Sequence, residues 1–411
     1  MNGTTDGAGL TDAGQTDGTG PALRVTLDVS AVPANPAGAG RYVIELARAL
    51  GQRDDVDLVL VGRRGDAERW GSAAAARTGP GDLGAGTMTA PARRPLRLAW
   101  EQVRLPGLLD DLGPAVHHSP HYTMPERARV PVVVTIHDLT FFDHPEWHER
   151  SKAVLFRRAI RVACRRAAAI VCVSATTAVR LREVCEVGVP VVVAPHGVDH
   201  LRFRPDDPQP GSDEAALHAL GVDPSRPLVV FVGTLEPRKG AAGLVEAFDA
   251  VAGRHADAQL VLAGQPGWGP DDVGRAVGTA RHRDRVVLTG YVPDAAVPAL
   301  LRRAAVVAYP ALQEGYGLPA LEALACGAPL VTTSGTAMEE MAGGAALLVP
   351  PGDALALADA LDAVLGRSGG AALAEDRRRS GLAVAAARTW EQSALHHVEA
   401  YRLAVDARLR P

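Results

Sequence analysis

Short runs of valine, isoleucine and leucine alternate along this 411-residue chain with alanine-, leucine- and arginine-rich segments of helical period. Strands that are apolar along nearly their whole length belong to parallel sheets covered by helices on both faces. The pattern therefore predicts an α/β protein with doubly wound parallel sheets. The strand-like runs form two sets, the first at 23–29, 56–61, 131–136, 169–173 and 190–194, and the second at 227–232, 258–263, 285–290, 304–309 and 328–333.

A polar, proline-rich segment at 206–214 separates the two sets and is typical of a linker. The chain is long enough for two domains, each with its own core. We therefore divide it near residue 205. The expected parts are a disordered tail at 1–21, an N-terminal Rossmann-like domain at 22–205, a C-terminal Rossmann-like domain at 206–387, and a helix at about 388–411 that packs back on the first domain.

The composition is that of a soluble globular protein, with 47% hydrophobic and 22% charged residues. A formal charge of −4 argues against bulk binding of nucleic acid. No apolar run approaches the length of a membrane span, and the N-terminus lacks the pattern of a signal peptide. The four cysteines form no CxxC pair. We expect a cytoplasmic protein without disulfides or a zinc site.

Unusual residues gather where predicted strands end. Ligands of open α/β sheets bind beyond the carboxyl ends of the strands. The loop after the first run carries Gly38 and Gly40, and His137 directly follows run 131–136. Arg238 and Lys239 follow run 227–232, and Glu314 follows run 304–309. This clustering predicts a ligand site at the facing edges of two sheets.

Arg238 and Lys239 form a cationic pair just before a predicted helix. Arginine offers a fork and lysine a point charge, which together suit a diphosphate. The alternative is a solvated basic pair, but cations at a helix N-terminus oppose the helix dipole. The chain also uses arginine almost everywhere, and Lys152 is its only other lysine. We therefore favour phosphate binding.

Three other features leave alternatives open. The stretch EGYGLPALE carries Glu314 and Glu322, which also fit a helix start with an acidic first turn. His137 can be a capping or core histidine, or can point into an interdomain cleft. His117, His118 and His121 lack a matching set of metal ligands, so we treat them as loop residues. The only Asp-x-Asp spacing, Asp55 and Asp57, lies at the start of a strand, which indicates chemistry that needs no metal.

Together these residues resemble the retaining glycosyltransferases of family 4. The matching stretches are VSATT (173–177), APHGVDHLRF (194–203), GTLEPRKG (233–240) and PALQEGYGLPALEALACGAPLVTT (310–333). The resemblance covers about residues 22–405. It implies the GT-B architecture, in which two Rossmann-like domains face each other across a deep cleft, with the acceptor on the first domain and the nucleotide sugar on the second.

The resemblance also implies roles for single residues. Arg238 and Lys239 would bind the donor diphosphate, Glu314 the sugar hydroxyls and Glu322 the ribose diol. The amides of Gly317 and Leu318 would meet the distal phosphate, and His137 would lie beside the sugar. Glu314, His137, Arg238 and Lys239 are the expected catalytic residues. The remaining expected binding residues are Gly38, Gly40, Gly233, Gly315 and Tyr316. No metal or other cofactor is implied.

The chain departs from the family pattern at three positions, and the sequence leaves the identity of the donor open. Ala311 and Gln313 replace the usual serine and aromatic residue of the family, and Glu339 replaces a proline. Segments 28–50, 118–125 and 135–147 resemble a mannosyltransferase subgroup that uses GDP-mannose, although UDP-glucose or another nucleotide sugar stays open. The rival functions are a sugar-nucleotide binder without turnover and a phosphorylase or sucrose-synthase-like enzyme of the same fold.

The acceptor is a glycan, a lipid-linked intermediate or a small molecule, with cell-envelope polysaccharide synthesis as the expected context. Segments 93–106 and 155–167 are basic and amphipathic. Such helices often lie on anionic lipid, so they indicate a peripheral contact with the inner face of the plasma membrane. A solvated cationic face is the alternative.

Overall fold

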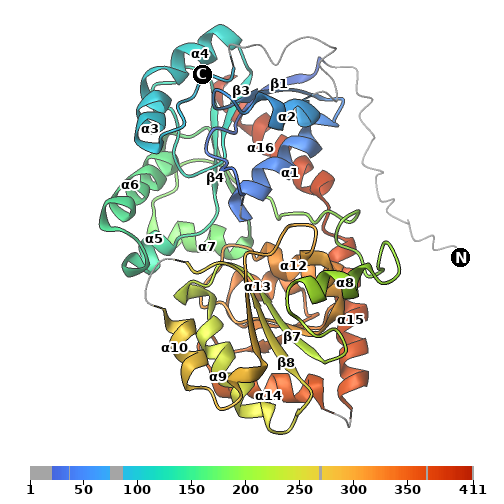
Figure 1. The fold of residues 1–411 in the computed structure, drawn as a ribbon. Helices are drawn as coiled ribbons and strands as arrows, with labels where there is room; N and C mark the ends of the chain where they lie inside the picture. The colour runs from blue at the N-terminus through green and yellow to red at the C-terminus, as the bar shows by residue number, and fades with distance from the viewer. Residues whose placement is uncertain (1–20, 37, 75–86, 268–270, 367–368, 410–411) are drawn as a thin grey trace, which may run out of the picture.

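The protein forms two α/β halves, one above the other in Figure 1. The computed structural model describes residues 21–36, 38–74, 87–267, 271–366 and 369–409. Apart from residue 21, the expected tail lies outside these ranges. Each half contains one six-stranded sheet, and every pairing within the two sheets is parallel. The expected fold class is confirmed.

The sheet of the first half has the strand order β2-β1-β3-β4-β5-β6. Its strands are β1 (Leu23–Asp28), β2 (Val56–Val61), β3 (Val116–Ser119), β4 (Val132–Ile136), β5 (Ala169–Cys172) and β6 (Val191–Val193). The helical segments are α1 (Gly38–Gly51), α2 (Ala67–Ala74), α3 (Arg94–Val103), α4 (Leu105–Leu112), α5 (Thr140–Asp143), η1 (Pro145–Trp147), α6 (Arg150–Arg166) and α7 (Ala175–Val184).

The sheet of the second half has the order β12-β11-β10-β7-β8-β9. Its strands are β7 (Leu228–Val232), β8 (Gln259–Ala263), β9 (Val286–Gly290), β10 (Ala304–Tyr309), β11 (Leu330–Thr333) and β12 (Leu347–Val349). The helical segments are α8 (Ser212–Ala219), η2 (Pro237–Lys239), α9 (Ala241–Ala252), α10 (Asp272–Thr279), η3 (Arg283–Arg285), α11 (Val297–Arg303), α12 (Leu318–Ala325), α13 (Ala337–Ala342), α14 (Ala354–Leu365), α15 (Gly370–Ala386) and α16 (Trp390–Leu409). The first turn of α8 falls within the segment expected to be a linker.

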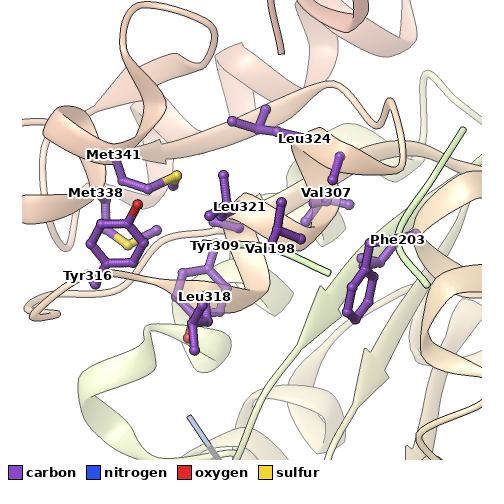
Figure 2. Packing of buried hydrophobic residues seen from close by; sticks show 14 of the residues in the cluster. Val198, Phe203, Val307, Tyr309, Tyr316, Leu318, Leu321, Leu324, Met338 and Met341 are labelled. Atoms are coloured by element: carbon purple, nitrogen blue, oxygen red, sulfur yellow. The ribbon is translucent and has the colours of Figure 1, made fainter. Parts of the chain in front are cut away.

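Helix α12 is apolar on nearly every side and is buried at the centre of the second half. Figure 2 shows Leu318, Leu321 and Leu324 of this helix packed with Met338 of α13 and Val307 of β10. Burying one such side chain stabilises the fold by about 1.5–3 kcal/mol. The surrounding core therefore fixes the position of α12, and with it the one carboxylate that the helix carries.

Strands β3 and β12 were missed by the sequence analysis. We expected His117 and His118 to be loop residues, and this was wrong, because both lie in β3 and are fully buried. Their neighbours β1 and β4 supply the backbone hydrogen bonds, while the imidazoles find side-chain partners such as Thr26 Oγ1, 2.9 Å from His117 Nδ1. Polar residues in a strand hide the apolar run on which the prediction depended. His121 does lie in the following loop.

The final helix, α16, leaves the second half and lies against α1 and against β3, β4, β5 and β6 of the first. The chain crosses between the halves where Gly197 meets Trp390. A Cβ on Gly197 would lie 2.2 Å from the backbone nitrogen of Trp390, so only glycine fits this crossing. Nearby, the amide of Val198 donates to the carbonyl of Arg388 at 3.1 Å. The two connections between the halves therefore pass side by side.

Candidate active site

The cations expected to bind phosphate lie at the carboxyl end of β7, in contact with Glu314. The Lys239 ammonium touches the Glu314 carboxylate and donates to the hydroxyl of Tyr309 at 2.9 Å. Arg238 Nη1 lies 3.3 Å from Glu314 Oε1, and Arg238 Nε donates to Glu236 at 2.8 Å. One carboxylate thus links both cations to the end of β10.

Burial sets the electrostatics of this cluster. It lowers the pKa of Lys239 well below the usual range, the neighbouring Arg238 lowers it further, and the carboxylates of Glu236 and Asp138 oppose the shift. Two cations held side by side, away from water, attract a ligand that carries more than one negative charge. A bound anion of this kind would oppose the lowering of the Lys239 pKa by burial and by Arg238.

The backbone around Gly240 locks the cationic loop onto β10. Gly240 has a φ of 72° and caps η2, and a Cβ at this position would lie 2.1 Å from the carbonyl oxygen of Pro310. The amide of Leu312 donates to the carbonyl of Arg238 at 2.8 Å. This close contact joins the loops that follow β7 and β10, and it holds Lys239 beside Glu314.

The turn between Glu314 and α12 depends on two glycines. Gly317 begins the helix with a φ of 95°, and a Cβ there would lie 2.2 Å from the sulfur of Met338. A Cβ on Gly315 would lie 1.7 Å from the backbone oxygen of His137, which belongs to the first half. Gly315 is therefore a contact between the halves as well as part of a turn.

Glu322 lies in α12, eight residues after Glu314, and faces Arg41 of the first half. Arg41 Nη1 donates to Glu322 Oε1 at 3.1 Å, and Arg41 Nη2 bonds Asp294, in the loop after β9. Burial raises the pKa of Glu322 to about 7, and Arg41 acts in the opposite direction. The carboxylate expected to meet the ribose is thus paired with an arginine that the sequence analysis missed. Its only signal was its position directly after Gly40.

His137 is buried at the end of β4, and its Nε2 lies 2.8 Å from the carbonyl oxygen of Pro120. Because a carbonyl only accepts hydrogen bonds, Nε2 carries the proton and Nδ1 keeps a lone pair. Burial lowers the pKa of His137, which favours the same neutral form. The residue is therefore a hydrogen-bond acceptor at Nδ1 and not a cation.

The ring of Tyr42, on α1, packs edge-on against His137, with 5.0 Å between ring centroids and 83° between planes. Two bonds of 2.8 Å join the Tyr42 hydroxyl to Thr135 Oγ1 and to His397 Nε2 of α16. His397 Nδ1 lies 2.7 Å from the carbonyl of Ser393, so Nδ1 carries the proton of His397. Tyr42 must then donate to His397, and Thr135 must donate to Tyr42.

The same chain of bonds continues to a second contact with α16. Since the Thr135 proton is used for Tyr42, Thr135 accepts from His118 Nε2 at 2.8 Å. His118 Nδ1 is then an acceptor, and the Tyr401 hydroxyl donates a hydrogen bond to it, also at 2.8 Å. Burial lowers the pKa of His118 well below its usual range, in agreement with a neutral ring. The donors of the whole chain therefore point one way, from Tyr401 to the Ser393 carbonyl.

The three remaining glycines lie at the edges of the site. Gly38 begins α1 and is exposed, with open space where a Cβ would be, whereas Gly40 is buried against Pro36. The carbonyl of Gly233 lies against Gly264, where a Cβ would approach it to 1.9 Å. Only Gly38 of these three leaves open space for a ligand.

Other bonds hold the two halves together around the cleft. Glu340 of α13 accepts from the amides of Ala175 and Thr176 at 2.7 and 2.8 Å, which caps the N-terminus of α7 from the opposite half. The Tyr316 hydroxyl donates to the carbonyl of His196 at 2.8 Å. Residues of both halves therefore contribute to the walls of one cleft.

The carboxylates, histidines and cysteines of the described residues are spread over the molecule and form no metal site. Among the described residues, no group of three histidine, cysteine or carboxylate side chains is placed to hold a metal ion. Asp55 and Asp57 lie at the start of β2, where Asp55 bonds Arg53 at 2.8 Å and Asp57 lies 3.7 Å from Arg24. The four cysteines are all buried and unpaired.

Two family models match the two halves. The model described as Glycosyltransferase Family 4 matches residues 36–202, and that described as Glycosyl transferases group 1 matches residues 226–367. These two ranges contain every expected site residue.

Curated relatives have related descriptions. O-antigen chain mannosyltransferase B of Escherichia coli is 28% identical over 318 residues, which cover 75% of this chain and 78% of that protein. The 2-deoxystreptamine N-acetyl-D-glucosaminyltransferase of Streptomyces fradiae is 30% identical over 67% of this chain and 65% of its own length. D-inositol 3-phosphate glycosyltransferase of Nocardia farcinica is 33% identical over 52% of this chain and 47% of its own length.

Solved structures share the fold. Sucrose-phosphate synthase from Thermosynechococcus elongatus superposes with a TM-score of 0.70 at 22% identity, covering 92% of this chain and 98% of the other. HepE of Anabaena in complex with UDP-glucose gives 0.70 at 17% identity, covering 92% and 99%. At these identities the similarity concerns the fold alone.

Proposed function

Because this chain belongs to glycosyltransferase family 4 and is a glycosyltransferase, we propose that it transfers a sugar from a nucleotide-sugar donor with retention of configuration. The donor we favour is GDP-mannose, since the relative matched over 75% of the chain is a mannosyltransferase. The observation that carries the proposal is the contact of Lys239 and Arg238 with Glu314 at the carboxyl ends of β7 and β10 in the second sheet.

The donor would lie across these residues. Lys239 and Arg238 would bind the diphosphate, which replaces part of their contact with Glu314 and leaves that carboxylate to the sugar hydroxyls. Glu322 would accept from the ribose diol once Arg41 has moved away. Gly317 and Leu318 would present the start of α12 to the distal phosphate. Gly38 would line the path of the donor, whereas Gly40, Gly233, Gly315 and Tyr316, which pack against other parts of the protein, would shape the backbone around that path.

The reaction would break the bond between the anomeric carbon and the leaving phosphate oxygen. The acceptor oxygen then bonds the same face of that carbon, and its proton passes to the leaving phosphate. Arg238 and Lys239 stabilise the negative charge that grows on the diphosphate, which is where electrostatic catalysis acts most strongly. His137, neutral and with its lone pair on Nδ1, accepts a hydrogen bond from a sugar hydroxyl and orients it. No metal is needed in this scheme.

Other donors and a binder without turnover are the alternatives. HepE was solved with UDP-glucose, so a UDP-sugar is the first rival donor. A thermal-shift screen against GDP, UDP and ADP at equal concentration separates the bases, because the ligand that binds more tightly raises the melting temperature more. Transfer and donor hydrolysis are then measured with the matching nucleotide sugars, with and without a chelator. Binding without hydrolysis or transfer from any donor would identify the binder.

A basic face of the first half fits an acceptor held at an anionic membrane. Val103 and Val154 are 70% and 69% exposed on α3 and α6. The arginines that are exposed on these helices or near them in the sequence include Arg93, Arg94, Arg104, Arg127, Arg129, Arg150, Arg158, Arg161, Arg165 and Arg166. Of these, Arg158 and Arg166 pair with Glu126, and Arg129 pairs with Asp110. Apolar side chains within a cationic surface are typical of peripheral contact with lipid. No helix among the described residues is long and apolar enough to cross a membrane.

We propose accordingly that the enzyme works in the cytoplasm at the inner face of the plasma membrane, on a glycan or lipid-linked acceptor. Co-sedimentation with vesicles of anionic lipid, compared with neutral vesicles, tests this contact. Binding to the anionic vesicles should weaken as salt is added. A protein that stays in the supernatant with both vesicles at low salt would indicate a soluble acceptor.

A further inference from the structure

A cavity of about 560 Å³ lies between the two halves beside Glu314. Its volume falls within the range of about 300–1,000 Å³ that is usual for small-molecule sites. The first half contributes Asp138, Phe142, Asp143 and Arg180 to its wall, and the second half contributes Gln313 and Glu314 among others. Neither Arg238 nor Lys239 lines it. The cavity therefore begins where the donor sugar is expected and extends away from the diphosphate.

The charge of the wall is negative. Apart from the imidazole of His144, the charged or titratable side chains described along it are the carboxylates of Asp138, Asp143 and Glu314 and the guanidinium of Arg180. Arg180 is already occupied. Its Nε and Nη2 lie 2.9 and 2.6 Å from Asp143 Oδ1, and its Nη1 lies 2.7 Å from Glu183. No cation of the described wall is available for a phosphate group, because Arg180 is held by Asp143 and Glu183, and Arg238 and Lys239 contact Glu314 from outside the wall.

The wall is instead built for hydroxyl groups. Asp143 accepts from Gln313 Nε2 at 2.7 Å through Oδ2, so the arginine and the amide hold this carboxylate in one orientation. Gln313 Oε1 is buried and has no hydrogen-bond partner among the described residues. An unsatisfied buried acceptor destabilises the protein, and a ligand hydroxyl that reached it after a small movement of the amide would remove that cost. Phe142, Leu139 and Pro351 offer apolar contacts to the carbon-bound hydrogens of a sugar ring.

We propose that this cavity is the acceptor subsite, and that it takes an uncharged sugar residue with free hydroxyl groups rather than a phosphorylated one. The inference rests on the proposed function, because an acceptor subsite has meaning only in a transferase. It distinguishes this chain from the matched relative that is named for D-inositol 3-phosphate. Gln313, noted above as a departure from the family pattern, becomes a residue that orients Asp143 toward the acceptor.

The first test uses the purified full chain and the donor found in the nucleotide screen. Nucleotide release is measured with methyl α-D-mannopyranoside or methyl α-D-glucopyranoside as neutral probes, and with mannose 6-phosphate or inositol 3-phosphate as anionic probes. The neutral glycosides should raise release above donor hydrolysis, and the phosphorylated sugars should not. Acceleration by the phosphorylated sugars alone, or to the same extent, would overturn the proposal, as would no effect of any neutral glycoside.

The second test assigns the effect to the cavity. Asp143→Asn and Gln313→Leu should raise the KM for the neutral glycoside by about ten- to a hundredfold, the usual loss for a hydrogen bond to a charged group. Donor affinity and hydrolysis without acceptor should stay unchanged. Glu186→Gln, an exposed change on the same half that lies outside the cavity, is the matched control. Unchanged KM values in both variants would place the acceptor elsewhere.

Ligand-observed NMR of the same glycosides gives a measurement that needs no turnover. Saturation transfer to methyl α-D-mannopyranoside should occur with the wild type and with Glu186→Gln and should be lost with Asp143→Asn. Equal transfer to all three proteins would overturn the subsite. Failure of the proposed function is a different result, namely no binding or hydrolysis of any nucleotide sugar before an acceptor is added.

Discussion

The backbone oxygen of His137 lies so close to Gly315 that a Cβ on residue 315 would approach it to 1.7 Å. The two residues belong to opposite halves of the molecule, and each directly adjoins the proposed chemistry. In the proposed function His137 would orient a sugar hydroxyl, and Gly315 directly follows Glu314. The contact therefore sets the distance between the two walls of the site with no side chain in between.

Replacement of Gly315 by alanine should separate the walls. The added methyl group cannot fit, so the halves must move apart at the sugar position, and a shift of about 1 Å can cost about a hundredfold in rate. We expect kcat to fall by this order while the melting temperature changes little. Gly243→Ala, on α9 with open space around its Cβ, is the control. A Gly315→Ala enzyme with wild-type kcat would show that the closed contact is unnecessary for turnover.

Lys239 and Arg238 are expected to act mainly on the transition state. Removing either cation should lower kcat by about 10²–10³-fold, the usual effect of losing a group that stabilises developing charge. Donor affinity, measured by titration calorimetry with the nucleotide, should weaken less. The control is Arg254→Ala, which removes an exposed cation two residues after the end of α9. Unchanged turnover in the double alanine variant would remove the pair from the mechanism.

Glu322 should make stability depend on pH. Its pKa in the folded protein is raised to about 7 from the ordinary 4.5, so the unfolded chain loses this proton at lower pH than the folded one does. The free energy of unfolding should therefore fall as pH rises from about 4.5 to about 7, by up to about 3 kcal/mol, and no further above that. Glu322→Gln removes this dependence.

The measurement compares urea unfolding of the wild type and Glu322→Gln at several pH values. The difference in favour of the variant should grow from pH 5 to pH 7. Glu246→Gln, at an exposed position on α9, should follow the wild type at every pH. A constant difference between wild type and Glu322→Gln across this range would contradict the raised pKa.

The Tyr42 hydroxyl should contribute more to the free energy of unfolding than a surface hydrogen bond does, because both of its hydrogen bonds are buried. Tyr42→Phe leaves His397 Nε2 and a bond of Thr135 unsatisfied inside the protein, and we expect a loss of about 1–3 kcal/mol in the free energy of unfolding. His397→Gln keeps an acceptor near the former Nε2, so it should cost less than His397→Leu. The stabilities of Tyr42→Phe, His397→Leu and the double variant, measured by chemical unfolding, should be non-additive. Additive losses would mean that the two groups do not depend on each other.

How far the sequence predicted the fold depended on how apolar each strand is. Strands such as β7 and β8 were found because their apolar runs are unbroken. Strand β3 was missed because His117 and His118 stand where apolar residues were expected, and β12 because Leu347–Val349 is too short to form a pattern. In both cases pairing with neighbouring strands supplies what the local sequence lacks.

The candidate site was predictable where its residues follow strands in the sequence. Arg238, Lys239 and Glu314 meet at the carboxyl ends of β7 and β10, as the topology requires. Arg41 was not predictable, because its partner Glu322 is 281 residues away on the other half. The role of Gly315 was likewise hidden, since the atom that excludes a side chain belongs to His137. A contact between domains does not change the hydrophobic periodicity of either segment, so sequence patterns do not reveal it.

Helix α16 has a consequence for how the protein is made. It completes the first half but lies after the whole second half in the chain, so a ribosome finishes the second half before the first is complete. Until then Tyr42 and His118 lack their α16 partners, and one face of the first sheet is uncovered. We therefore expect the first half to stay incompletely folded until translation ends, and we expect a product that stops before α16 to be the more sensitive to proteases.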